Sequence, residues 1–131
     1  PALQEFKDAE GDPQLKQERH RAHQEMLNNA SILAVRDADV LIVNPTHLAT
    51  ALRYNEEESE APRIVAQGEG IVARQLIDAA RAYGVPIVRD VPVARALKEM
   101  EVGDEIPEAL YETVAEILRE VWSQSGGESD D

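Results

Sequence analysis

An asparagine–proline pair directly follows a short aliphatic run, and this junction limits the fold more than any other feature of the sequence. Residues 39–43 (DVLIV) are mostly β-branched and aliphatic, which is typical of a buried strand. Asn44-Pro45 must end that strand, because proline has no N–H for a strand ladder and restricts the residue before it. The sequence therefore predicts a turn here, followed by a second strand over about residues 47–54.

Beyond this junction the pattern alternates strands with helices. Residues 64–66 and 86–88 are predicted strands, and residues 71–83 between them are predicted to form a helix that Gly84 ends. This strand–helix–strand order implies a parallel, right-handed crossover. Another short helix is predicted over residues 93–100.

Both ends of the chain are predicted to differ from this centre. Asp12-Pro13 suits a helix start, but the helix expected from there to about Ala30 has only a thin apolar stripe, so we expect a protruding arm that docks near its C-terminal end. A last helix is predicted from Pro107. The expected domains are a connector and helical arm (1–33), an α/β domain (34–122) and a disordered acidic tail (123–131). The expected fold class is α/β, with a small mixed four-stranded sheet surrounded by about four helices.

Composition limits the partners. The chain has 131 residues, 43% of them apolar, and no cysteine, so one compact domain fits and disulfide or thiolate chemistry is excluded. A net charge of −13 argues against nucleic acid or an anionic membrane as the main partner. Residues 101–131 carry ten acidic side chains and one arginine, which fits a solvated helix face with a soluble tail or a patch for a basic partner. The chain begins with Pro1 rather than methionine, so we expect it to be a piece of a longer protein.

The tetrad Asn44-Pro45-Thr46-His47 is the one motif that carries reaction chemistry. Its ordinary interpretation is a β-turn that joins two strands. Its reactive interpretation starts from Pro45, which has no N–H with which to attack the Asn44 side chain and cause deamidation. The Asn44 amide nitrogen can still attack its own main-chain carbonyl, which forms a succinimide ring and breaks the Asn44–Pro45 bond.

An amide is a poor nucleophile, so this reaction needs help from its neighbours. His47 is the natural candidate to assist proton transfer to the departing Pro45 nitrogen, because histidine serves most often in such transfers near neutral pH. Thr46 is expected to stabilise the developing oxyanion or simply to fix the turn. The alternative interpretation of His47 is an ordinary histidine at a strand edge.

No cofactor or metal site is predicted. Gly68-Glu69-Gly70 before a helix is a weak phosphate-loop pattern, and Glu69 would repel a phosphate. His20 and His23 lie three apart on the first predicted helix without a second pair of ligands, which favours a solvated face.

Several stretches of the sequence, in order, closely resemble the FlhB/YscU family of export-switch proteins of flagellar and injectisome type III secretion. They are VLIVNPTH (40–47), APRIVAQG (61–68), YGVPIVRDVPVARAL (83–97) and GDEIPEALYETVAEIL (103–118), and EFKDAEGDPQLKQERHRAHQEM (5–26) is similar to the family's connector. One departure is Lys98, which stands where the family often has an aromatic residue.

The resemblance implies a cytosolic domain that follows N-terminal transmembrane helices at the cytoplasmic face of the bacterial inner membrane. It implies self-cleavage within the tetrad Asn44–His47, with the two pieces remaining associated, and a switch of export from early to later substrates. The implied partners are other export-apparatus proteins, secreted substrates and a length-control regulator, with no nucleic acid and no cofactor. The cleavage is a single intramolecular event, so the domain is not expected to be a turnover enzyme.

We further expect secretion partners to read the surface remodelled by the cut together with a basic region around Arg74, Arg81 and Arg95. The alternative for these arginines is solvation with salt bridges to neighbouring acids. The first alternative for the whole domain is a non-cleaving interaction or scaffold domain in which the tetrad is only a turn. A true hydrolase is the second, although no nucleophile–base–orienter set is visible in the sequence.

Overall fold

The computed structural model describes residues 12–45 and 47–129, with side chains described up to residue 124. The chain divides into two compact units between residues 30 and 31. The helix α2 (Pro13–Val35) crosses this division. Among the described residues, no helix is long and apolar enough to span a membrane.

The helix α2 starts where the sequence predicts and continues past Ala30. The Asp12 carboxylate accepts a hydrogen bond from the Gln14 N–H at 2.9 Å, which satisfies one of the free N–H groups of the first turn. Most side chains of residues 12–30 are exposed. Only Val35, in the last turn, is fully buried, and it belongs to the core of the second unit.

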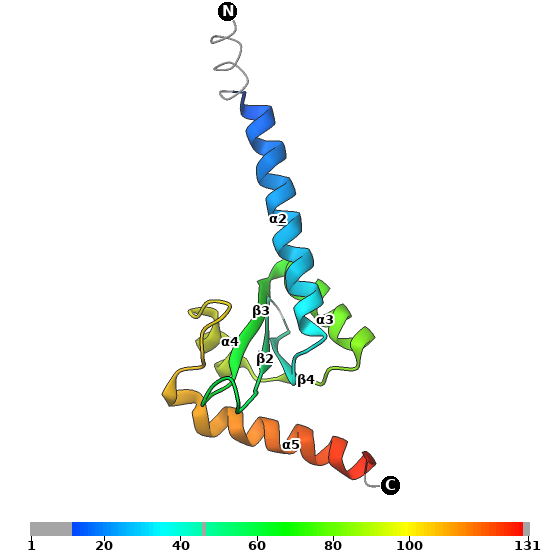
Figure 1. The fold of residues 1–131 in the computed structure, drawn as a ribbon, viewed down its shortest axis with the longest axis vertical. Helices are drawn as coiled ribbons and strands as arrows, with labels where there is room; N and C mark the ends of the chain where they lie inside the picture. Colours follow the sequence, from blue (N-terminus) through cyan, green and yellow to red (C-terminus); the bar gives the residue numbers. More distant parts are fainter. Residues whose placement is uncertain (1–11, 46, 130–131) are drawn as a thin grey trace, which may run out of the picture. The chain divides into compact units, whose positions relative to one another are not determined.

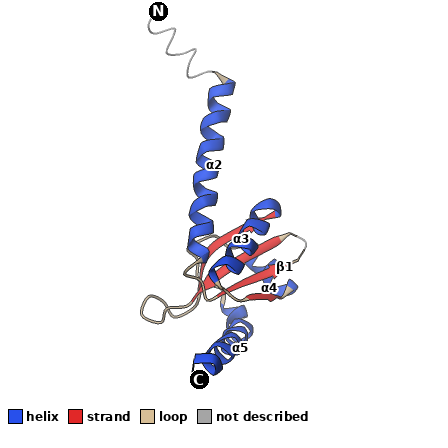
Figure 2. Cartoon of the chain, turned by 90° about the vertical axis from the view of Figure 1, so that its right-hand side faces the viewer, coloured by secondary structure: helices blue, strands red, loops and turns tan. Residues whose placement is uncertain are grey.

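The second unit is built on one four-stranded mixed sheet, which confirms the predicted fold class. The strands are β1 (Val40–Asn44), β2 (Leu48–Arg53), β3 (Arg63–Glu69) and β4 (Ile87–Arg89), in the spatial order β3-β2-β1-β4. Strand β2 is antiparallel to both β1 and β3, and β4 is parallel to β1. Strand β1 therefore lies inside the sheet, with a partner on each side (Figure 2).

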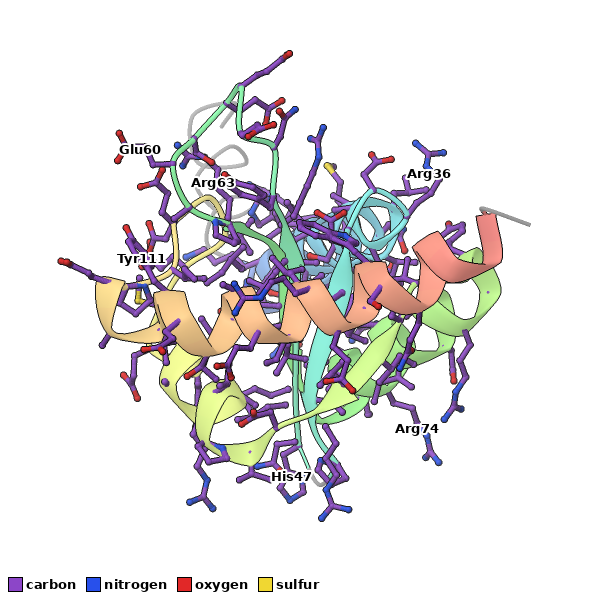
Figure 3. The ribbon with its side chains drawn as sticks, turned by 90° about the horizontal axis from the view of Figure 1, so that it is seen from below. Arg36, His47, Glu60, Arg63, Arg74 and Tyr111 are labelled. Atoms are coloured by element: carbon purple, nitrogen blue, oxygen red, sulfur yellow. The ribbon has the colours of Figure 1, made fainter. Side chains whose placement is uncertain are left out.

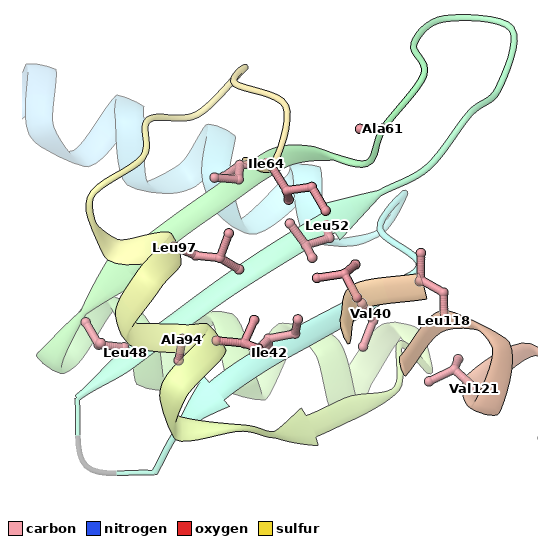
Figure 4. Close-up of a cluster of buried hydrophobic side chains, with 13 residues drawn as sticks. Val40, Ile42, Leu48, Leu52, Ala61, Ile64, Ala94, Leu97, Leu118 and Val121 are labelled. Carbon is pink, nitrogen blue, oxygen red and sulfur yellow. The ribbon is translucent and has the colours of Figure 1, made fainter. Parts of the chain in front are cut away.

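Helices cover both faces of this sheet, so β1 is buried on both sides. Helix α3 (Gly70–Tyr83) lies on one side and α4 (Val91–Lys98) on the other (Figure 1). Leu41 and Val43 join the core under α3, whereas Val40 and Ile42 join the core under α4 and the final helix (Figure 4). This double burial explains why residues 40–43 form an unbroken aliphatic run rather than an alternating one.

A β-bulge in β3 lets Ile64 and Ala66, which are two residues apart and would share one face of a regular strand, enter opposite cores. Ala51 pairs with Ala66 and Leu52 with Ile64, so Val65 is the extra residue of the longer strand. As a result, Ile64 is buried with the α4 core and Ala66 with the α3 core.

Gly68 allows β3 to turn directly into α3. A Cβ atom at this position would collide with the Val72 side chain and lie 3.3 Å from the Ala73 nitrogen. Glycine is thus needed for close approach of strand and helix. At the other end of α3, Gly84 adopts a φ of 75°, and the Val85 N–H donates to the Ala80 carbonyl at 2.8 Å, as predicted for a glycine that ends a helix.

The C-terminal segment differs from its prediction. Residues 108–110 form a short 3-10 turn, and α5 (Tyr111–Ser129) continues to Ser129, whereas the sequence predicts a disordered tail from residue 123. The buried residues Val114, Leu118 and Val121 anchor α5 on the sheet. An anchored helix can extend further because each added residue gains one backbone hydrogen bond and needs no new nucleus. Residues 130–131 lie outside the described residues.

Candidate functional site

The tetrad lies in the tight connection between β1 and β2. Asn44 is the last residue of β1 and pairs with Leu48, the first residue of β2. The His47 N–H donates a hydrogen bond to the Asn44 carbonyl oxygen at 3.1 Å, which is the i to i+3 bond of a β-turn. Pro45 and His47 are exposed and Asn44 is half-buried, while Thr46 lies outside the described residues. The Asn44 carbonyl, which the predicted cut would separate from Pro45, therefore accepts a hydrogen bond from a main-chain N–H.

The main chain on both sides of the turn is fixed to other elements. Before the turn, the Val43 carbonyl accepts a hydrogen bond from the Asp90 N–H at 3.1 Å, and the Asp90 side chain caps α4 through the Val93 N–H. After the turn, the His47 carbonyl accepts from the Gly70 N–H at 3.0 Å. Gly70 has a φ of 56°, which glycine adopts without the steric penalty of a Cβ atom.

The turn borders a hollow of about 440 Å³ beside helix α3. Its lining includes Asn44, Pro45 and His47 from the turn. The facing residues of α3 are Gly70, Ala73, Arg74, Ile77, Asp78 and Arg81. The view in Figure 3 shows His47 and Arg74 along one side of the domain, away from the labelled Glu60 and Tyr111.

The structure brings two of the three predicted arginines to this hollow. Arg74 and Arg81 line it, whereas Arg95 lies on α4, which covers the opposite face of the sheet, and is not among the lining residues. Within the described part of the chain, none of the three forms a salt bridge, so the alternative in which neighbouring acids neutralise them is not observed. The sequence spacing of Arg74 and Arg81, seven apart on one helix, already places both on one face.

Sequence reasoning missed three groups at this site. Asp78 lies between the two arginines on the same face of α3, and its position four residues after Arg74 is the signal that identifies it. The other two are backbone donors, the N–H groups of His47 and Gly70, which no pattern of side chains can reveal. Electrostatic and hydrogen-bonding roles at a turn often fall to such main-chain groups.

Other predicted features lie apart from the turn. Lys98, the departure from the family pattern, forms a salt bridge with Glu69 between Nζ and Oε1 at 3.3 Å. In residues 12–45 and 47–129, no group of three or more histidine or acidic side chains is placed to hold a metal ion.

Comparison with known sequences places the chain among secretion proteins. The family model described as the FlhB HrpN YscU SpaS family matches residues 2–121. The flagellar biosynthetic protein FlhB of Yersinia enterocolitica is 40% identical over 129 residues, which cover 94% of this chain and 34% of that protein. The hypersensitivity response secretion protein HrcU of Ralstonia nicotianae is 44% identical over 115 residues, covering 87% of this chain and 32% of that protein. The chain thus spans about a third of the length of these relatives.

Solved structures share the fold. The cytoplasmic domain of FlhB from Shewanella putrefaciens matches with a TM-score of 0.70 and 35% identity, covering 72% of this chain and 79% of that one. An EscU C-terminal domain with an asparagine-to-aspartate substitution matches with a TM-score of 0.69 and 31% identity, covering 76% of this chain and 92% of that one. The EscU domain has also been solved with alanine replacing that asparagine and with alanine replacing the proline that follows it.

These matches agree on one family and one fold, and they include both flagellar and other secretion proteins. The chain belongs to the FlhB, HrpN, YscU and SpaS family and has the α/β fold of the FlhB and EscU cytoplasmic domains.

Proposed function

We propose that this domain cuts its own backbone between Asn44 and Pro45, and that the cut controls the substrate specificity of a type III secretion export apparatus. The observation that carries the proposal is the turn itself, in which the carbonyl to be attacked is held by the His47 N–H at 3.1 Å. The EscU domain has been solved with substitutions at a consecutive asparagine and proline, which supports the choice of this dipeptide as the site of the cut.

The proposed reaction needs no external reagent for the cut. The Asn44 side-chain nitrogen bonds to the Asn44 main-chain carbonyl carbon, and the bond from that carbon to the Pro45 nitrogen breaks. The amide loses one proton and the Pro45 nitrogen gains one, with the His47 imidazole as the carrier. His47 suits this role because its exposed side chain borders the same hollow as Pro45. The event occurs once in each chain, so the domain is not a turnover enzyme.

The backbone hydrogen bond from His47 supplies transition-state stabilisation. Attack on the Asn44 carbonyl places negative charge on its oxygen, and that oxygen already accepts the His47 N–H. Mutational losses of one such donor typically cost about 10²–10³ in rate. The proposed oxyanion donor is therefore the His47 main chain, and the predicted role of Thr46, to stabilise the oxyanion or to fix the turn, stays a prediction.

The cut leaves the sheet intact. Residues 1–44 contribute β1, which pairs with β2 and β4 of the downstream piece. Every side chain from Val40 to Ile42 is fully buried, so the two pieces remain associated through the core after the bond is broken.

The switch acts through partners at the cytoplasmic face of the bacterial inner membrane. We propose that other export-apparatus proteins, secreted substrates and a length-control regulator read the surface around the cut, including Arg74 and Arg81. Arg95 is left out of this surface, because it lies on α4, which covers the opposite face of the sheet.

A denaturing gel of the purified protein tests the cleavage. The wild-type chain is expected to give two pieces, residues 1–44 and 45–131, and Asn44→Ala to give one full-length band because the attacking nitrogen is gone. Asn55→Ala, which removes an asparagine side chain from the loop after β2, is the matched control and should still give two bands. A single wild-type band would favour the scaffold alternative, in which the tetrad is only a turn.

A further inference from the structure

The hollow beside the turn is lined by two arginines that form no salt bridge with any residue the structure describes. Arg74 and Arg81 line it from α3, and among the described residues neither has an oppositely charged group within salt-bridge distance. The chain as a whole has a net charge of −13. The lining of the hollow includes these two guanidinium groups and one carboxylate, that of Asp78, so it is net positive in an otherwise acidic protein and suits an anion.

The proposed cleavage produces such an anion at this place. Water opens the succinimide ring: its hydroxyl joins one ring carbonyl carbon and its remaining hydrogen joins the ring nitrogen. Either direction of opening leaves residue 44 with one carboxylate, on its main chain or its side chain. The Pro45 nitrogen, released as an amine, takes up a proton and becomes a cation. A neutral turn is thereby converted into one negative and one positive chain end.

We propose that Arg74 and Arg81 bind the carboxylate that cleavage creates at residue 44, an inference that rests on the proposed function. Asn44 and both arginines line the same hollow, so the new carboxylate arises within the region the guanidinium groups border. Arginine binds a carboxylate through paired, charge-assisted hydrogen bonds, which are stronger than neutral ones. Asp78, between the two arginines, provides the matching negative charge for the Pro45 cation.

With this assignment, the cut changes whether Arg74 and Arg81 are accessible to a partner. In the uncut chain, Arg74 and Arg81 are available to an acidic partner, whereas in the cut chain they are occupied by the protein's own new end. The surface offered to partners therefore changes in charge without a change of fold.

The test compares a cut and an uncut form of the whole chain. The cut form is made by co-expressing residues 1–44 and 45–131 as two chains, so it has the new end whether or not the protein cleaves itself. The uncut form is the single-chain Asn44→Ala variant. Each is prepared with the native arginines, with the pair Arg74→Gln and Arg81→Gln, and with Arg95→Gln as the control. Urea unfolding is followed by the fluorescence of Trp122, the only tryptophan.

The arginine pair is expected to matter only after cleavage. Replacing Arg74 and Arg81 should lower the urea midpoint of the two-chain form by about half a molar, as expected for roughly 1 kcal/mol of charge-assisted bonding. The midpoint of the single-chain form should not move, and Arg95→Gln should change neither form. Equal shifts in both forms, or no shift in the two-chain form, would overturn the proposal. Self-cut wild-type protein provides the same comparison if the separate chains do not assemble.

Failure of this proposal is distinguishable from failure of the cleavage. An uncut wild-type chain on the denaturing gel would refute self-cleavage, and the two-chain form would still measure whether the arginines bind the end of residue 44.

Discussion

Replacing Ile42 with alanine is expected to lower the free energy of unfolding by about 2–5 kcal/mol, the usual cost of removing a large buried aliphatic side chain. Ile42 has no exposed surface and lies in β1, opposite Thr50 of β2 and Val88 of β4. Its side chain packs with the core under α4 (Figure 4). The loss should be measured by urea unfolding in the uncut Asn44→Ala background, where a single chain unfolds.

The same substitution at Ile71 is the control. Ile71 lies in the first turn of α3 and is 78% exposed, so Ile71→Ala should change stability by no more than about 0.5 kcal/mol. In the cut protein β1 belongs to the piece made of residues 1–44. Ile42→Ala should therefore weaken the association of that piece with residues 45–131. The pieces should then separate at lower urea than in the cut wild type. Equal effects of the two substitutions would contradict the central position of β1.

Replacing His47 with alanine is expected to slow cleavage by about 10²-fold or more, the usual contribution of a positioned proton-transfer group. The substitution removes the imidazole and leaves the main-chain N–H that holds the Asn44 carbonyl oxygen. It therefore separates proton transfer to Pro45 from stabilisation of the oxyanion. The rate is measured from the growth of the two pieces on denaturing gels after refolding of uncut chains.

His23→Ala is the matched control, because His23 is exposed on α2, outside the unit that contains the turn. It should cleave at the wild-type rate. A His47→Ala rate equal to that of the wild type would show that the imidazole has no part in the reaction, and the turn geometry alone would then have to account for cleavage.

Sequence patterns predict most of the fold because they record local constraints. The aliphatic run before Asn44 and the proline after it define the end of β1, and Gly84 ends α3 as its position predicts. The bulge at Val65 is different, because it depends on which core each neighbouring side chain enters. Packing of its apolar face on the core establishes helix α5. The helix can therefore continue beyond its predicted end, whatever the propensity of its last residues.

The chemistry of the site could be predicted only in part. The identities of Asn44, Pro45 and His47 suggest the proposed reaction, since each has a chemical property that the proposed cut would use. The partners of the turn come from elsewhere in the fold: Gly70 through its N–H, and Arg74 and Arg81 through the shared hollow. Arg95 resembles them in the sequence, but α4 covers the other face of the sheet, and no local pattern distinguishes the two faces.

The most direct test of the account is the intact mass of Asn44→Asp beside that of the wild type after incubation at neutral pH. This substitution keeps the shape of the side chain and replaces the amide nitrogen proposed to attack the backbone with a carboxylate oxygen. The account predicts two masses for the wild type, corresponding to residues 1–44 and 45–131, and one undivided mass for Asn44→Asp. Cleavage of Asn44→Asp at the wild-type rate, or a wild-type chain that stays whole, would contradict it.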